Sequence, residues 1–222
     1  MRVLIACGGT GGHINPGLAI ADIIKSKYPD TEFLFAGTPK GMEAKLVPAA
    51  GYRFETIKVA GFQRRISLEN IGRNAKAVAY LITSGRRAKQ IIEGFKPDIA
   101  IGTGGYAAGP VIRKAARMGI PTAIHEQNAY PGVTNKLLSK EVDHVMLTVK
   151  EALNFMDGSK FEHTVTGLPV RRNIKNSISR AEARKKLGFN DDFTILSFGG
   201  SLGAGCINET MTEAIKWHVG KG

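Results

Sequence analysis

Three glycine-rich loops, each lying between an apolar run and a helical pattern, constrain the fold of this chain most. The first loop, CGGTGGH, follows the apolar run RVLIA. GTGGY repeats the arrangement after DIAI, and FGGSLGA repeats it after TILS. Glycine permits positive φ and close approach of a ligand to the backbone, and a helix start presents free N–H groups to phosphate. The recurrence favours a ligand-binding role over a simple tight turn.

Short apolar runs alternate with helical patterns along most of the chain. We expect strands at 2–6, 32–36, 54–59, 98–101, 122–125 and 144–147, and helices at 15–28, 42–50, 68–92, 107–118 and 133–139. Asn15 as N-cap and Pro16 as first helical residue are expected to start the first helix. This order predicts an α/β fold with a parallel sheet and helices on both faces. In such sheets ligands lie at the carboxyl ends of the strands.

A second unit is expected to begin near Thr164, which gives domains at 1–163 and 164–222. Ser179 followed by Glu182 predicts a capping box at the start of a helix. FTILSFGG reads as a strand, and SLGAGCINE opens a further helix. A doubly wound domain usually needs about 100 residues or more, so this second Rossmann-like domain is predicted to be incomplete.

Composition limits the class of protein. Hydrophobic residues make up 43% of the chain, enough to bury a core, so disorder is excluded. Two cysteines without a CxxC pair indicate neither a disulfide scaffold nor a zinc site, and we expect no export signal and no membrane span. A formal net charge of +12 predicts an anionic partner: phosphate groups, an acidic membrane surface or nucleic acid. No nucleic-acid-binding motif accompanies the charge, so we expect no nucleic acid.

The first loop fits neither of the two common nucleotide-binding signatures. Ile14 stands where GxGxxG requires its third glycine, and no acidic residue follows the second strand to hold a ribose. No Gly-Lys-Ser/Thr sequence follows either, as a Walker A loop requires. We therefore expect no nicotinamide, flavin or other cofactor.

Several motifs together resemble the MurG family of bacterial glycosyltransferases. These are GGTGGHINPGLAIA, GTGGYAAGP, HEQNAYPGVTNKLL, TGLPVR and GGSLGAGCINE, in family order over nearly the whole chain. The resemblance implies a GT-B fold, in which two Rossmann-like domains face each other across a cleft. It implies an inverting transfer of N-acetylglucosamine from UDP-GlcNAc to undecaprenyl-pyrophosphoryl-MurNAc-pentapeptide in peptidoglycan synthesis. Family members are longer, so the chain is expected to be truncated at its C-terminus.

The resemblance also implies the residues that bind each substrate. Contacts to UDP-GlcNAc are assigned to Thr10, Gly11, Gly12, Asn128, Arg171 and Ser201. The acceptor diphosphate is assigned to Gly9, Gly104, Gly105 and Tyr106. An arginine fork suits phosphate and an asparagine amide suits sugar hydroxyls. The chain has no Asp-x-Asp sequence to hold a metal, so the leaving diphosphate is expected to be stabilised without a metal ion.

His13 ends the first loop, and two roles remain open for it. Its neutral imidazole can accept the proton of the acceptor hydroxyl, which makes it the candidate general base. Alternatively it only caps the loop or donates a hydrogen bond. His125, at a strand end, is expected to be structural, and Glu126 and Gln127 are expected to order the site around Asn128.

A basic segment without acidic residues lies between Glu69 and Glu93. Its membrane-facing candidates are Arg73, Lys76, Arg86 and Arg87. An apolar helical stripe accompanies them, so the segment is either a core-facing helix with a solvated face or a patch that docks on anionic lipid. The lipid acceptor favours the second alternative and a peripheral position on the cytoplasmic face of the plasma membrane.

Two other functions stay open at this point. One is a different GT-B glycosyltransferase with another lipid acceptor. The other is a truncated, inactive fragment that binds only lipid or a protein partner. A substrate screen separates the first from the MurG-like activity, and the downstream nucleotide sequence decides the second.

Overall fold

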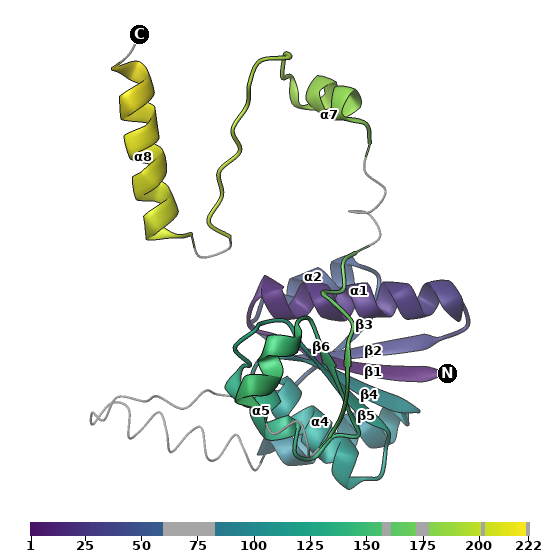
Figure 1. Ribbon diagram of the computed structural model, residues 1–222. Helices are drawn as coiled ribbons and strands as arrows, with labels where there is room; N and C mark the ends of the chain where they lie inside the picture. Colours follow the sequence, from purple (N-terminus) through teal and green to yellow (C-terminus); the bar gives the residue numbers. More distant parts are fainter. Residues whose placement is uncertain (60–82, 157–160, 172–177, 201–202, 221–222) are drawn as a thin grey trace. The chain divides into compact units, whose positions relative to one another are not determined.

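The structure is a computed structural model that forms two compact units, 1–175 and 176–222 (Figure 1). It describes residues 1–59, 83–156, 161–171, 178–200 and 203–220. Arg73, Lys76 and Ser201, predicted above to bind membrane or donor, lie outside these ranges.

The first unit is built on a parallel sheet of seven strands (Figure 1). The strands are β1 (Arg2–Cys7), β2 (Glu32–Gly37), β3 (Arg53–Thr56), β4 (Ile99–Gly104), β5 (Thr122–Glu126), β6 (His144–Leu147) and β7 (Glu162–Val165). Their order in the sheet is β3-β2-β1-β4-β5-β6-β7, and every neighbouring pair is parallel. The predicted α/β class and parallel sheet are confirmed, and the order reverses between β1 and β4.

Helices cover both faces of this sheet. They are α1 (Gly11–Lys27), α2 (Glu43–Ala49), a helix at 83–95, α4 (Ala108–Arg117), α5 (Val133–Leu138) and the 3-10 helix η1 (Lys150–Phe155). β1 explains why two cores form: Val3 and Ile5 pack with α1 on one face, while Leu4 packs with α4 on the other. Alternate residues of a strand point to opposite faces, so a strand apolar throughout is buried on both.

The first helix begins five residues earlier than expected, at Gly11 and not at Pro16. Thr10 is its N-cap and Pro16 lies inside it, whereas Asn15 was predicted to be the N-cap. Pro16 has no N–H to donate to the carbonyl of Gly12, and glycines are poor helix formers. The Thr103 hydroxyl of β4 donates to the neighbouring His13 carbonyl over 2.7 Å and so links this first turn to the sheet. The glycines of the first loop therefore belong partly to the helix.

The division between the units differs from the expected one at 163/164. β7 pairs with β6 and completes the first sheet, and the compact first unit extends to Lys175. The strand in HTVTG thus belongs to the first sheet, because His144 to Leu147 of β6 supply its hydrogen-bonding edge.

The second unit contains two helices, α7 (Arg180–Leu187) and α8 (Gly205–Val219). The capping box of α7 is confirmed: Ser179 accepts from the Glu182 N–H, and the Glu182 carboxylate accepts from the Ser179 N–H over 2.9 Å. The Ser179 hydroxyl also donates to the Glu182 carboxylate over 2.7 Å, and this bond together with the Ser179 N–H lowers the pKa of Glu182. The strand predicted at FTILSFGG, 193–200, is not formed, and Phe193 is 91% exposed. A strand needs a paired neighbour, and the described part of this unit contains none. The second Rossmann-like domain therefore stays a prediction.

Candidate functional site

The glycine loops after β1 and β4 meet at the switch point of the sheet, where the strand order reverses. A Cβ atom on Gly105 would collide with the backbone of Gly8, so the two loops touch backbone to backbone. A Cβ atom on Gly104 would lie 2.7 Å from Nδ1 of His13. Glycine at these positions therefore lets the second loop pack against the first loop and against the imidazole.

His13 is held from two strands at once. Its Nδ1 atom lies 3.1 Å from the Thr103 carbonyl oxygen on β4 and 3.1 Å from the amide oxygen of Gln127, which follows β5. The side chain is partly exposed, so one edge of the ring remains reachable. The structure thus places the predicted base at the junction of β1, β4 and β5.

Gln127 sets which nitrogen of His13 carries the proton. The Gln127 amide nitrogen donates to the carbonyls of Thr103 (3.0 Å) and His125 (2.9 Å), so its oxygen is the atom that faces His13. Both partners of the His13 Nδ1 atom are then acceptors, and Nδ1 must be the donor. In the neutral ring Nε2 is consequently unprotonated, which is the form a general base needs.

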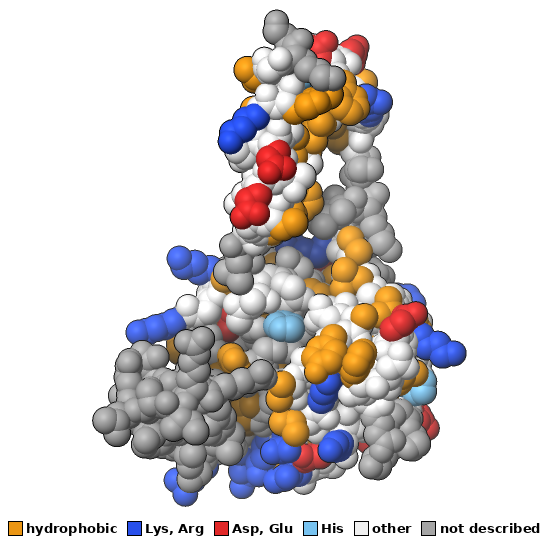
Figure 2. Space-filling model, turned by 60° about the vertical axis from the view of Figure 1, so that its left-hand side comes forward, with side chains coloured by type: hydrophobic (Ala, Val, Ile, Leu, Met, Phe, Trp, Pro, Cys, Tyr) orange, Lys and Arg blue, Asp and Glu red, His pale blue; other side chains and the backbone are white. Residues whose placement is uncertain are grey.

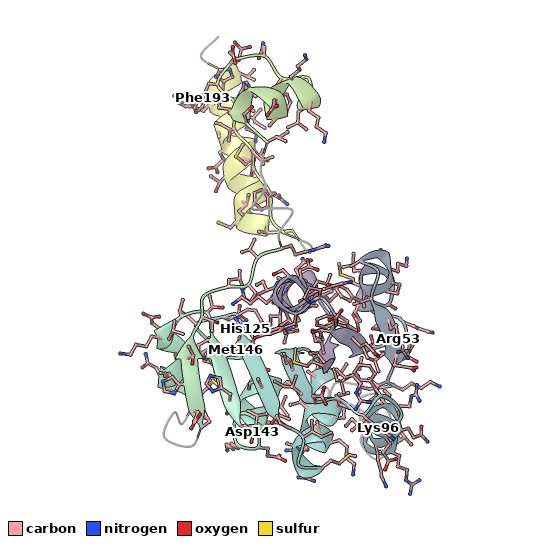
Figure 3. All side chains as sticks on the ribbon, turned by 90° about the vertical axis from the view of Figure 1, so that its right-hand side faces the viewer. Arg53, Lys96, His125, Asp143, Met146 and Phe193 are labelled. Carbon is pink, nitrogen blue, oxygen red and sulfur yellow. The ribbon has the colours of Figure 1, made fainter. Side chains whose placement is uncertain are left out.

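His125 is fully buried at the carboxyl end of β5, where Figure 3 labels it. Its Nε2 atom lies 3.1 Å from the Gly167 carbonyl and donates to it, while Nδ1 shares one N–H of the Gln127 amide with the His125 carbonyl. Burial lowers the pKa of His125, against smaller opposing effects of the Gly167 hydrogen bond and the Glu126 charge. A buried, neutral imidazole bonded at both nitrogens fits the expected structural role.

Glu126 shapes the loop that carries Asn128. This carboxylate is 1% exposed and accepts from the Asn128 and Gly132 backbone N–H groups and from the Asn135 side chain, over 2.9, 3.0 and 2.9 Å. The Asn128 side-chain nitrogen also donates to it over 3.1 Å. The amide oxygen of exposed Asn128 is therefore turned away from Glu126 and suits a sugar hydroxyl.

The remaining predicted binding residues fall into two groups. Thr10, Gly9, Gly11, Gly12 and Tyr106 lie in or beside the two interlocked loops, with Tyr106 64% exposed. Arg171 lies elsewhere: its Nε atom is 3.9 Å from the Asp22 carboxylate in α1. Asp22 is about 16 Å along the helix axis from the start of α1, at 1.5 Å per residue. The structure does not bring Arg171 to the glycine loops.

The two described members of the basic segment differ in their contacts. Arg86 is exposed, whereas Arg87 forms an ion pair of 2.5 Å with Glu55 and donates to the Thr56 carbonyl. Lys and Arg side chains gather along the lower edge of the first unit in Figure 2. In the described part of the chain no helix is long and apolar enough to cross a membrane.

Among the described residues, no three His, Cys, Asp or Glu side chains lie together in a way that could hold a metal ion. Independence from metal stays a prediction. Gln127 was expected only to order the site. Glu43 was not predicted, because nothing local in the sequence marks a carboxylate that contacts a loop 34 residues away.

Comparison with known proteins gives a family and close relatives. The glycosyltransferase family 28 N-terminal domain matches residues 3–147. The chain is 51% identical over 220 residues to the UDP-N-acetylglucosamine–N-acetylmuramyl-(pentapeptide) pyrophosphoryl-undecaprenol N-acetylglucosamine transferase of Acetivibrio thermocellus, covering 98% of this chain and 58% of that protein. The protein of the same name from Desulfitobacterium hafniense strain Y51 is 47% identical, covering 100% and 58%.

A solved structure shows the same fold. The crystal structure of Acinetobacter baumannii MurG superposes with a TM-score of 0.66 and 28% identity, covering 97% of this chain and 57% of that chain. The chain therefore spans somewhat more than half the length of the relatives that it matches.

Proposed function

The chain belongs to glycosyltransferase family 28, and on that premise we propose that it takes part in N-acetylglucosamine transfer from UDP-GlcNAc to undecaprenyl-pyrophosphoryl-MurNAc-pentapeptide. The names of the relatives at 51% and 47% identity support this substrate pair. The observation that carries the proposal is His13, held by Thr103 and Gln127 with Nε2 unprotonated, beside two interlocked glycine loops.

In the proposed reaction, Nε2 of His13 accepts the proton of the acceptor hydroxyl. The hydroxyl oxygen forms a bond to C1 of the sugar from the face opposite the diphosphate. The bond between C1 and the diphosphate oxygen breaks, and UDP leaves with the electron pair. This displacement inverts the configuration at C1.

The other groups serve binding. The amide oxygen of Asn128 accepts from a sugar hydroxyl, while Glu126 fixes its nitrogen. The loops at Gly8–Thr10 and Gly104–Tyr106 receive the acceptor diphosphate, assisted by the positive end of α1. Arg171 reaches a donor phosphate only after it leaves Asp22.

In this proposal the basic segment binds the membrane that holds the acceptor. Exposed Arg86 and the excess of 31 Lys and Arg over 19 Asp and Glu support docking on an anionic surface. A lipid-linked acceptor and a nucleotide donor are both accessible at the cytoplasmic face of the plasma membrane, which is the proposed location.

The test uses an extended chain, defined as this chain joined to the part of the Acetivibrio thermocellus relative that it does not match. Transfer of labelled N-acetylglucosamine to the lipid acceptor is measured for the extended chain and for its His13→Ala variant. We expect kcat to fall about 100-fold or more when the base is removed, with donor affinity unchanged. His163→Ala, an exposed histidine on β7, is the control. A fall below about fivefold would leave His13 only a structural role.

A further inference from the structure

Glu43 is a fully buried carboxylate that the proposed reaction does not use. It is the first residue of α2, and its two oxygens accept three hydrogen bonds. Oε2 accepts from the Gly9 N–H of the first glycine loop over 3.2 Å. Oε1 accepts from the N–H and the hydroxyl of Thr38 over 2.8 and 2.6 Å. An isolated buried carboxylate is costly, and these charge-assisted bonds offset that cost.

The backbone around Glu43 leaves space for its side chain and for nothing more. A Cβ atom on Gly8 would lie 2.6 Å from Oε1 of Glu43, and one on Gly37 would lie 2.5 Å from its Cγ atom. A Cβ atom on Gly41 would collide with the carboxylate. Three glycines, from the ends of β1 and β2 and from the start of α2, thus converge on one side chain.

The first glycine loop connects this carboxylate to the candidate base. Gly8 contacts Glu43 on one side and the backbone of Gly105 on the other. The neighbouring Gly104 packs against the imidazole of His13. Displacement of the first loop therefore moves the second loop, and with it the surface on which His13 rests.

We propose that Glu43 is a built-in anion of the first glycine loop, a positioning residue that holds the loop in shape before any phosphate binds. Its carboxylate takes the place that an anionic ligand takes in other glycine loops, with the Gly9 N–H and the two Thr38 donors around it. The link to His13 rests on the proposed function, whereas the role in the loop does not.

One consequence concerns the predicted diphosphate site. While Glu43 accepts the Gly9 N–H, that N–H points to the protein and not to a bound diphosphate. A phosphate at this loop must then be bound through other groups, such as the first N–H groups of α1. The loop is built to keep its shape between catalytic cycles.

Cys7 provides a probe of this loop that does not depend on activity. It is fully buried at the end of β1, directly before Gly8. Burial and the Glu43 charge raise the pKa of the Cys7 thiol to about 12, so it reacts with thiol reagents only when the loop opens. The other cysteine, Cys206, is exposed and is replaced by serine in every protein tested.

The experiment measures the rate of Cys7 alkylation by iodoacetamide in the 222-residue chain. Glu43→Gln keeps the size and one acceptor oxygen but turns an NH₂ group toward the Gly9 N–H. Glu43→Ala removes both oxygens. After correction for the lower thiol pKa that loss of the Glu43 charge gives, we expect alkylation to become about tenfold faster or more in each, the factor for losing a hydrogen bond to a charged group. Rates within about twofold of the parent in both variants overturn the proposal.

A matched control separates loop opening from general destabilisation. Asp143 accepts from the N–H and the hydroxyl of Thr122 over 2.7 and 2.8 Å, as Glu43 does from Thr38. Figure 3 labels Asp143 at the end of the sheet opposite His125. Asp143→Ala should leave the Cys7 rate within about twofold, because opening at one end is local. An equal acceleration by this control overturns the proposal.

Formate tests the anionic character of the group directly. In Glu43→Ala the cavity has the size and the donors for a small carboxylate, so added formate should slow Cys7 alkylation toward the parent rate. Formamide, which is neutral, should not. If formate and formamide act alike, or neither slows the reaction, the site does not require an anion and the proposal fails.

The catalytic part is measured in the extended chain. Glu43→Gln should lower kcat about tenfold, because the loop positions His13. The KM for UDP-GlcNAc should change less than about threefold, because the loop does not bind the nucleoside. Asp143→Ala should leave both within about twofold. An extended chain without transferase activity would defeat the proposed function but leave the alkylation result standing. An unchanged kcat in an active protein would defeat the positioning role alone.

Discussion

The Nδ1 atom of His13 lies 3.1 Å from the amide oxygen of Gln127, although 114 residues separate them in the chain. The Gln127 nitrogen is already committed to two carbonyls, so its oxygen has one orientation. A glutamine fixed in this way selects the His13 tautomer whose Nε2 atom can take a proton. Orientation of a base by a third group is a recurrent arrangement in enzymes that activate a hydroxyl.

Replacement of Gln127 tests this relationship. In the extended chain, Gln127→Ala should lower kcat/KM about tenfold, because the imidazole loses the group that sets its tautomer. Gln127→Glu should move the acid limb of the pH–rate profile to higher pH, because a carboxylate favours the protonated imidazole. The measurement is kcat/KM from about pH 5 to about pH 9, because histidine usually titrates between about pH 5 and 8. An unshifted acid limb in Gln127→Glu would contradict the tautomer assignment.

Acid should destabilise the first unit through His125. Burial lowers the pKa of His125 in the folded protein, so below the ordinary histidine value of about 6.5 the unfolded chain binds more protons. Stability from this group is therefore present above pH about 6.5 and is lost as the pH falls through the lower, folded pKa. The slope for one proton is at most about 1.4 kcal/mol per pH unit.

Urea unfolding of the 222-residue chain at several pH values measures this slope. His125→Gln lacks the titrating group, so its free energy of unfolding should fall less steeply with acid, even though it starts lower because the Gly167 hydrogen bond weakens. His144→Gln, on the neighbouring strand, is the control. Parallel slopes for His125→Gln and the parent would show that another group carries the acid sensitivity.

The sheet could be predicted from the sequence because its signals are local. The four central strands β1, β2, β4 and β5 are short runs buried on both faces, and each is followed by a helix. The edge strand β7 is polar and exposed, and its place in this sheet was not predicted. The start of α1 could not be predicted, since Pro16 normally marks a first turn and only the long-range Thr103 contact shows otherwise. The run at 193–198 has the composition of a strand. A strand also needs a neighbouring strand to pair with, and the composition of a segment does not show whether one is present.

The site was predictable only in part, because some of its residues are brought together by long-range contacts. Glycine loops at strand ends and His13 stand out in the sequence because parallel strands place their carboxyl ends together. Glu43 contacts Gly9 and Gln127 contacts His13, which are 34 and 114 residues away in the chain. Contacts between such distant residues produce no recognisable motif in the sequence. Arg171 fits a phosphate by chemistry alone, whereas in the structure its nearest charged partner is Asp22.

Binding to anionic vesicles tests the basic segment. Changing Arg73, Lys76, Arg86 and Arg87 to glutamate should abolish co-sedimentation, because each basic residue at the surface contributes about 1 kcal/mol. The control has the same change of net charge elsewhere: glutamate at Arg113, Lys114, Arg117 and Lys140. It should retain most binding, and raised salt should release the parent protein. Equal loss in both variants would attribute binding to net charge and not to this segment.

Titration with UDP-GlcNAc tests how the donor is bound by the 222-residue chain. The described part of the second unit has no buried residue in α7 or α8, so it offers no packed pocket for uracil or ribose. Arg171, the predicted phosphate fork, must first leave Asp22. Phosphate contacts at a loop, without recognition of the nucleoside, give weak binding, and we expect a Kd of about 1 mM or higher, which is about −4 kcal/mol. Asp22→Asn should tighten binding if it frees Arg171, and adding Arg171→Ala to that variant should cancel the gain. The measurement is isothermal titration of the parent, the two single variants and the double variant. Micromolar binding by the parent chain, unaffected by Arg171→Ala, would show that the donor is held by other residues.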